Sequence, residues 1–365
     1  APIHWGRCGD PVKPSIHDYY GLSKVVSERE VFESGLKYWV SIRQTGMHPI
    51  KEGAENEPII FHQAPNDVME WSTAIESGIA MANLCEDWVD ESFWRKAYNL
   101  SSGAKWRYAN WEFTNLNLAP LGLKYEDVYD PREMAIFNFH GQWFTDSQML
   151  DDYLHFRCVD HDAYIAGMNE EVEAYMANPM IAAMMPNAEQ MRAKNAQIGH
   201  KEGGFHWMFE NNKEDYIKAF FGSRERQAQI KSFEEGYKLY RPSEKETYLD
   251  HGYDESKPTS ELDINDMEGA AKFRGGECLS ESMKKGDLFT PLKWRCAFGH
   301  EFKATPNLIL NGGHWCPECN RYEWNYGEIA KVNPFFAQVW TPINGNACDY
   351  KIKKKVSEFD ILKEI

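Results

Sequence analysis

The chain has 365 residues, of which 42% are hydrophobic and 14% aromatic, enough for two domains or one large elaborated domain. Its net charge is −16, which argues against a general binder of nucleic acids or anionic membranes, because phosphate neutralisation needs clustered Lys and Arg. The basic run KIKKK at 351–355 is interpreted as a solvated tail.

The sequence predicts a soluble protein of a reducing compartment. No apolar run approaches the ~20 residues of a membrane span, and charges, Pro and Gly interrupt the N-terminal stretch where a secretion signal would be apolar. Cys85 and Cys158 stand in apolar sequence surroundings, as reduced buried thiols do. A cytoplasmic location is therefore expected.

Hydrophobic periodicity and turn residues predict alternating helices and strands in the first part of the chain, hence an α/β fold. In chain order, the predicted elements are a helix over 18–34 capped by Asp18, a strand over 37–45, a strand over 58–63, a helix over 66–85, a strand over 94–103, a helix from about 109 to Pro120, a strand over 135–144 and a helix capped by Asp146.

The rest of the chain is predicted to hold a helical region and a small cysteine-bearing module. Residues 159–240 look mostly helical, and the methionines between 176 and 191 are interpreted as adaptable core filling. The polar segment 241–263 holds two prolines and is interpreted as a linker or surface segment. The predicted domains are 1–155, 156–260 and 261–365.

Tyr20 and Lys24 are the candidate catalytic pair. They stand four residues apart at the start of a predicted helix, in DYYGLSKVVSERE, and so share one helix face. A nearby ammonium favours phenolate, and lowering a phenol pKa from ~10 by ~3 units is worth ~4 kcal/mol. Such a pair can move a hydroxyl proton while hydride passes to a nicotinamide. The alternative is two polar residues on a solvated helix face, because this spacing alone is common by chance.

Three segments together resemble the extended short-chain dehydrogenase/reductases, the NAD-dependent epimerase/dehydratase group. They are DYYGLSKVVSERE, KYWVSIRQTGMHP and AYNLSSG, and the resemblance covers roughly residues 1–155. It implies the C-terminal part of a Rossmann-like parallel sheet followed by a helical substrate-side region. It also implies NAD or NADP as cofactor, with Tyr20 as acid/base, Lys24 as ribose clamp, and Arg43, Gln44 and Thr45 on a loop near the nicotinamide.

The sequence departs from this family in one respect. The family's Gly-x-x-Gly-x-x-Gly turn, whose amides hold the pyrophosphate, has no match, because KEGG at 201–204 and RGGE at 274–277 lack the preceding strand and the spacing. The N-terminal nucleotide-binding half is therefore expected to be absent, either because the sequence is a fragment or because that half is supplied elsewhere.

A second motif, WRCAFGHEFKATPNLILNGGHWCPEC, predicts a metal site. Cys296 and His300 have the spacing C-x3-H, and Cys316 and Cys319 form a C-x2-C pair, which together complete a tetrahedral structural zinc site. His314 and Cys278 are weaker candidate ligands. The block resembles treble-clef zinc ribbons attached to enzymes and nucleases. Its charge is nearly balanced, so a structural or docking role is favoured over contact with DNA.

The favoured hypothesis is an NAD(P)-dependent oxidoreductase of the epimerase/dehydratase type, in which Tyr20 and Lys24 act on a carbonyl or hydroxyl of a small-molecule substrate. The alternative is a non-catalytic, zinc-stabilised protein-binding module on a remnant Rossmann scaffold. A nucleic-acid-associated zinc protein is a third hypothesis, against which the acidic charge argues. A homodimer is expected, because the helices matching those of Tyr20 and Val68 often form a dimer contact in the families that this chain resembles.

Overall fold

A computed structural model describes residues 4–12, 19–48, 57–136, 141–321 and 326–345. The chain forms two compact units, each assembled from separated segments. Unit 1 spans 44–89 and 100–245, and unit 2 spans 2–43, 90–99 and 246–365. The predicted domains are consecutive stretches of sequence, whereas unit 2 combines three segments that are separated in the sequence.

Unit 2 contains a three-stranded antiparallel sheet with the strand order β11-β10-β9. Leu292 and Trp294 of β10 are buried while Lys293 between them is exposed, so one face of the sheet packs on a core. The elements of this unit are β1 (Trp5–Gly6), α1 (Tyr19–Phe32), β2 (Val40–Gln44), η3 (Glu91–Phe93), β6 (Lys96–Leu100), η7 (Thr259–Glu261), α12 (Ile264–Phe273), β9 (Glu277–Cys278), β10 (Leu292–Arg295), β11 (Glu301–Ala304), α13 (Pro306–Leu310), α14 (Pro317–Arg321), α15 (Tyr326–Val332) and α16 (Pro334–Asn344).

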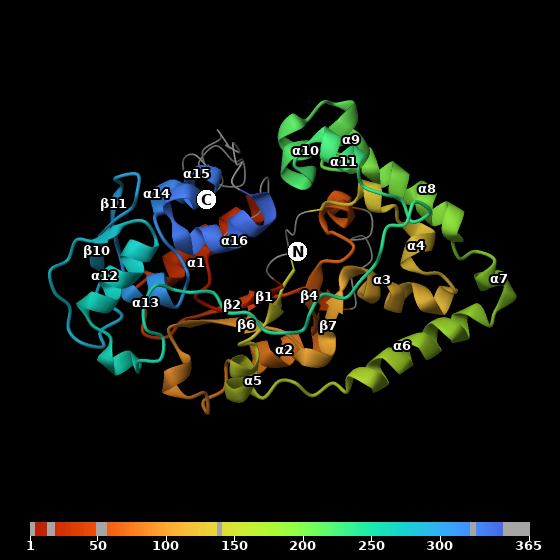
Figure 1. Ribbon diagram of the computed structural model, residues 1–365. Coiled ribbons are helices and arrows are strands. Elements are labelled where there is room, and N and C mark those ends of the chain that lie inside the picture. Colours follow the sequence, from red (N-terminus) through yellow and green to blue (C-terminus); the bar gives the residue numbers. More distant parts are fainter. Residues whose placement is uncertain (1–3, 13–18, 49–56, 137–140, 322–325, 346–365) are drawn as a thin grey trace. The chain divides into compact units, whose positions relative to one another are not determined.

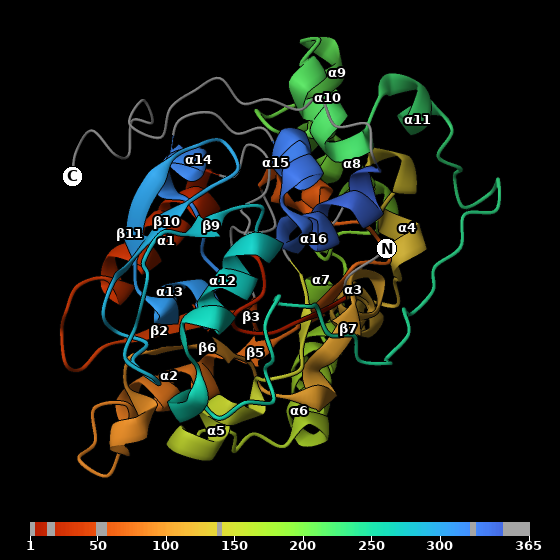
Figure 2. The ribbon, with the colours of Figure 1, turned by 60° about the vertical axis from the view of Figure 1, so that its left-hand side comes forward.

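The core of unit 2 joins the N-terminal helix to the C-terminal module. Trp294 is fully buried and its indole nitrogen donates to the carbonyl oxygen of Ala304 at 2.9 Å, so the ring is both packed and hydrogen-bonded. Phe32 of α1 and Trp39 belong to the same cluster of buried residues. Helix α13 contacts α1 (Figure 2). The helix that carries Tyr20 and Lys24 is therefore part of the unit that carries the cysteine motif.

Unit 1 combines short strand pairs with a run of helices. Strands β3 and β5 are parallel, and β4 and β7 are antiparallel. Trp71, Trp106 and Phe113 form a buried cluster, in which the rings of Trp71 and Phe113 stack at 3.6 Å between centroids. The elements, labelled in Figure 1 where there is room, are β3 (Met47–His48), η2 (Pro58–His62), β4 (Val68–Glu70), β5 (Ser72–Thr73), α2 (Ala74–Asn83), η4 (Ala104–Trp106), β7 (Arg107–Ala109), α3 (Asn110–Leu118), η5 (Ala119–Leu121), α4 (Tyr125–Val128), η6 (Pro131–Glu133), β8 (Trp143–Phe144), α5 (Gln148–Leu154), α6 (His161–Met176), α7 (Pro179–Ala182), α8 (Ala188–Gly199), α9 (Phe205–Glu210), α10 (Glu214–Phe221) and α11 (Arg224–Ala228).

Several predicted elements are confirmed and two are wrong. The predicted helices over 18–34 and 109–120 are α1 and α3, and the predicted strands over 37–45 and 94–103 contain β2 and β6. Asp18 lies outside the described residues. The segment 58–63 is a 3₁₀ helix instead of a strand, with Pro58 in its first turn and Phe61 buried. The helix predicted over 66–85 begins at Ala74, because the Thr73 hydroxyl caps it by accepting from the Glu76 amide.

Three further expectations differ from the structure. Within the segment 135–144, the described strand β8 covers Trp143–Phe144, and 137–140 lies outside the described residues. Met180 and Met184 are 78% and 83% exposed, so they do not fill a core, and Cys85 and Cys158 are exposed as well. The periodicity of a short segment cannot tell a core face from a solvent face when its partners are unknown.

The α/β class is confirmed, whereas a Rossmann-like parallel sheet is not. The described strands form sheets of two or three strands, and the three-stranded one is antiparallel. Helices α6 to α11 supply the predicted helical region. No helix within the described ranges has both the length and the apolar character needed to cross a membrane.

Unit 2 also contains a buried histidine between two carboxylates. His251 is 2% exposed; its Nε2 lies 2.8 Å from Asp10 Oδ1 and its Nδ1 lies 2.9 Å from Glu255 Oε1. The Arg7 guanidinium lies 2.8 Å from Glu255. Burial lowers the pKa of His251, but the hydrogen bonds with Asp10 and Glu255 outweigh burial and the net pKa is raised.

This histidine makes the stability of unit 2 depend on pH. Because the folded-state pKa of His251 is raised, its contribution is fully present below the unfolded-state value of 6.5 and is lost as pH rises through the folded value. His251→Gln should therefore lower the free energy of unfolding more at about pH 5.5 than at about pH 8.5. Urea unfolding of both proteins at the two pH values measures this, and equal losses would contradict it.

Candidate metal centre

The cysteine motif places four potential ligands around one point. Cys296 follows β10 directly and His300 precedes β11, so the turn between the two strands carries both. Within this turn the Cys296 amide donates to the His300 carbonyl at 3.0 Å, and Gly299 has φ +82°, where glycine is strongly favoured. Cys316 precedes Pro317, the first residue of α14, and Cys319 lies inside that helix. Two short local structures thus present one pair of ligands each.

The distances fit a tetrahedral zinc site. His300 Nδ1 lies 3.5 Å from Cys296 Sγ and 3.6 Å from the sulfurs of Cys316 and Cys319. The Cys296 and Cys319 sulfurs are 3.9 Å apart. Zinc bonds of about 2.3 Å to sulfur and about 2.0–2.1 Å to nitrogen, at tetrahedral angles, separate ligand atoms by about 3.8 Å and about 3.6 Å. All four ligand atoms lie within 4.8 Å of one another, so the group could hold a metal ion.

The three thiols shift one another's pKa values through mutual hydrogen bonds. Hydrogen bonds from Cys316 and Cys319 lower the pKa of Cys296 far below that of an ordinary thiol. Hydrogen bonding to Cys296 raises the pKa of Cys316. The pKa of Cys319 is raised mainly by hydrogen bonds with Cys296 and Cys316, and to a smaller extent by burial. A divalent cation would stabilise all three thiolates, so metal binding would release protons.

The two weaker candidate ligands lie outside this group. His314 is 1% exposed, and its Nε2 lies 2.8 Å from Glu28 Oε2 on α1. Cys278 lies in β9 opposite Trp294, with its sulfur 4.0 Å from the Ser280 carbonyl oxygen. The sequence pattern offered both as ligands because each stands close to the motif, but their side chains have other partners.

The partner of His314 belongs to a buried charge network that the sequence did not reveal. The Arg43 guanidinium makes two hydrogen bonds of 2.9 Å to the two oxygens of Glu28, and Ser41 donates to the same carboxylate at 2.6 Å. Burial would raise the pKa of Glu28, but Arg43 and His314 hold it well below its usual range. Burial also lowers the pKa of His314. No local pattern indicates this network, because Arg43 and His314 stand 15 and 286 residues away from Glu28 in sequence.

Tyr20 and Lys24 lie together on α1. The Lys24 ammonium lies 5.1 Å from the centre of the Tyr20 ring, as expected for neighbours one helical turn apart. Tyr20 is 70% exposed and Lys24 is exposed too. The ammonium faces the ring, while the hydroxyl of Ser23 is bonded to the Tyr20 carbonyl at 2.8 Å. The pair is accessible to a ligand from solvent.

The residues predicted for the nicotinamide loop lie where the chain passes from unit 2 to unit 1. Arg43, in β2, donates hydrogen bonds to the Glu28 carboxylate and to the Gly312 carbonyl, the latter at 2.7 Å. Gln44 ends β2 and is exposed, with its amide nitrogen 3.2 Å from the Met47 sulfur. Thr45 follows the strand and is partly buried. The roles of Gln44 and Thr45 at a cofactor stay a prediction.

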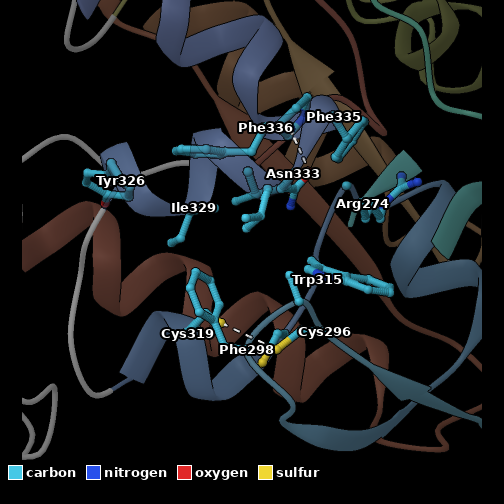
Figure 3. Close-up of a pocket in the computed structure, with 16 residues that line it drawn as sticks. Arg274, Cys296, Phe298, Trp315, Cys319, Tyr326, Ile329, Asn333, Phe335 and Phe336 are labelled. Carbon is cyan, nitrogen blue, oxygen red and sulfur yellow. Dashed lines mark hydrogen bonds between the residues drawn. The ribbon is translucent and has the colours of Figure 1, made fainter. Parts of the chain in front are cut away.

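An apolar cavity of about 50 Å³ lies beside the metal centre. Figure 3 shows Cys296, Cys319 and Phe298 on one side of it, and Asn333, Phe335 and Phe336 on the other. A cavity of this size holds a few water molecules at most, since one water needs about 10–15 Å³. The four ligands already complete a tetrahedron, so this arrangement is typical of a structural rather than a catalytic site.

No family model, curated protein or solved structure matches the chain. The likeness to the epimerase/dehydratase group therefore rests on the three sequence segments quoted above. The basic run at 351–355 lies outside the described residues.

Proposed function

We propose that the chain is an NAD(P)-dependent oxidoreductase of the epimerase/dehydratase type whose unit 2 is stabilised by one structural zinc ion. The zinc ion is proposed because the side chains of four residues converge at the separations that zinc ligands have: Cys296, His300, Cys316 and Cys319. Zinc suits three thiolates and an imidazole, and a closed set of four protein ligands leaves no position for substrate.

The oxidoreductase reaction is proposed because the exposed phenol of Tyr20 lies beside the Lys24 ammonium at the start of α1. Lys24 would donate hydrogen bonds to ribose hydroxyls and place a positive charge beside the phenol. Tyr20 would take the proton from a substrate hydroxyl, or return it to a carbonyl, at its phenolic oxygen. The bound nicotinamide would supply the hydride chemistry.

Cofactor titration tests this proposal directly. Adding NADH or NADPH to the complete purified protein should quench tryptophan fluorescence and raise the melting temperature, because a ligand that binds the folded state stabilises it. Lys24→Met should weaken the response by removing the ammonium while leaving an unbranched side chain. No response of the complete wild-type protein to either cofactor would contradict the cofactor assignment, whatever its zinc content.

The exposed position of Tyr20 on α1 also supports a second candidate function. A phenol that is 70% exposed is also what a solvated helix face presents, and Arg43 is engaged by Glu28. On this alternative the chain is a non-catalytic, zinc-stabilised module that binds another protein. It predicts bound zinc together with the absence of any cofactor response, so the two measurements separate the candidates.

A further inference from the structure

We propose that metal binding at the four-ligand centre and the ordering of helix α1 are thermodynamically coupled through the loop 311–316. The inference rests on the zinc part of the proposed function, because it takes that centre to be occupied. It goes beyond that part by making the metal a determinant of the helix that presents Tyr20 and Lys24. Coupling of this kind requires two sites and contacts that differ between the metal-bound and metal-free states.

The loop is fixed to the metal centre at one end and to α1 along its length. Its last residue, Cys316, is a ligand. The residue before it, Trp315, accepts a hydrogen bond from the Arg29 guanidinium at 2.8 Å through its carbonyl oxygen. One residue earlier, His314 binds Glu28 at 2.8 Å. Two consecutive residues of the loop are thus bonded to two consecutive residues of α1.

The network continues from the loop into strand β2. The Gly312 carbonyl accepts from Arg43 at 2.7 Å, and Arg43 binds both oxygens of Glu28. His314 is 1% exposed and the Glu28 carboxylate 10% exposed, so these groups are shielded from water. Removing one partner of a buried charge network leaves the others without compensation, which costs far more than the loss of a surface pair.

A second contact ties the far end of α1 to the same module. The Glu33 carboxylate accepts from both the amide and the hydroxyl of Thr305, at 3.1 and 2.9 Å. Thr305 caps α13, and α13 leads directly into the loop. The Phe32 ring lies 6.1 Å from the His314 ring and packs in the core of the module. The C-terminal half of α1 therefore depends on the position of residues 305–316.

The consequence is reciprocal. If the bound metal holds Cys316 in place, it also holds Trp315 and His314 where Arg29 and Glu28 bind them. Linkage is symmetric, so the ordered position of α1 must raise metal affinity by the same factor as the bound metal favours that position, and weakening these contacts should lower metal affinity. Substitutions in the polar groups that orient a metal site typically lower affinity by about 10- to 100-fold.

The test is a chelator competition on the folded, metal-loaded chain. Glu28→Gln and Arg29→Gln should each lower zinc affinity by about 10-fold or more. Two controls belong to the same unit. Glu91→Gln removes an equal charge from an exposed pair with Lys37, at 3.2 Å, and His251→Gln weakens unit 2 at its other buried network. Both should leave the affinity within about threefold of wild type, because neither touches the loop.

Hydrogen exchange supplies the second measurement. Partial zinc depletion should accelerate amide exchange in residues 20–32 by at least about tenfold while α3 of unit 1 keeps its protection. Equal zinc affinity in all four variants would overturn the coupling. So would amide exchange in α1 that does not change with the zinc content. A chain that binds no zinc would instead refute the zinc centre, and a zinc-loaded chain without cofactor response would refute only the oxidoreductase.

Discussion

Cys316→Ser is expected to reduce the zinc content from about one ion per chain to nearly none and to destabilise unit 2 by several kcal/mol. Cys316 is buried and its sulfur lies 3.6 Å from the His300 nitrogen, inside the four-ligand group. Structural zinc contributes about 10–16 kcal/mol to the folding of zinc-finger peptides, so losing a ligand removes a large stabilising interaction. Elemental analysis of the purified chain and its thermal unfolding measure the two effects.

Cys278→Ser is the matched control. Cys278 is a partly buried thiol of the same unit, but it lies outside the four-ligand group. Its substitution should leave the zinc content at about one per chain and change stability by about 1 kcal/mol or less. Equal zinc loss in both variants would mean that the ligands are wrongly assigned. A native wild-type chain without metal would refute the site itself.

Tyr20→Phe is expected to lower kcat by about 10²- to 10⁴-fold without disturbing the fold, since that is the usual contribution of a positioned acid or base. The substitution removes a single hydroxyl from a side chain that is 70% exposed. Its effect on the free energy of unfolding should stay within about 0.5 kcal/mol. Turnover with NAD(P) and a carbonyl or hydroxyl substrate measures the first effect, and denaturant unfolding measures the second.

Tyr38→Phe provides a control, because Tyr38 is also an exposed phenol beside an ammonium, but its hydroxyl donates to the Glu91 carboxylate at 2.8 Å. Tyr38 is 50% exposed, and the Lys37 ammonium lies 4.4 Å from the centre of its ring, closer than Lys24 lies to that of Tyr20. If any exposed phenol near an ammonium sufficed, both variants would behave alike. Loss of turnover confined to Tyr20→Phe would support its role, while full turnover in that variant would remove Tyr20 from the mechanism.

The sequence allowed the metal centre to be predicted because its information is local. Cys296 and His300 lie in the turn between two strands, and Cys316 and Cys319 lie at the start of one short helix, so the spacing within each pair determines which side chains can converge. The juxtaposition of Tyr20 and Lys24 was predictable for the same reason, since helical geometry fixes it. In both cases the chemistry follows from a few consecutive residues.

Features that depend on remote partners could not be predicted. The carboxylate of Glu28 and the ring of His314 are 286 residues apart in sequence, and nothing in either segment indicates the other. The start of α2 was missed because β4 and β5 pair with strands formed by residues 107–109 and 47–48. Local propensity favoured a helix there, but tertiary pairing took precedence.

The order in which a ribosome makes this protein conflicts with the order in which unit 2 can assemble. Helix α1 is complete at Phe32, yet its hydrogen-bond partners follow 272 to 286 residues later: Thr305 donates to Glu33, His314 binds Glu28 and the Trp315 carbonyl accepts from Arg29. At about 5–20 residues per second, α1 waits roughly 15–60 s with its apolar side unprotected. During this interval the apolar side chains of α1 are exposed to chaperones and to aggregation.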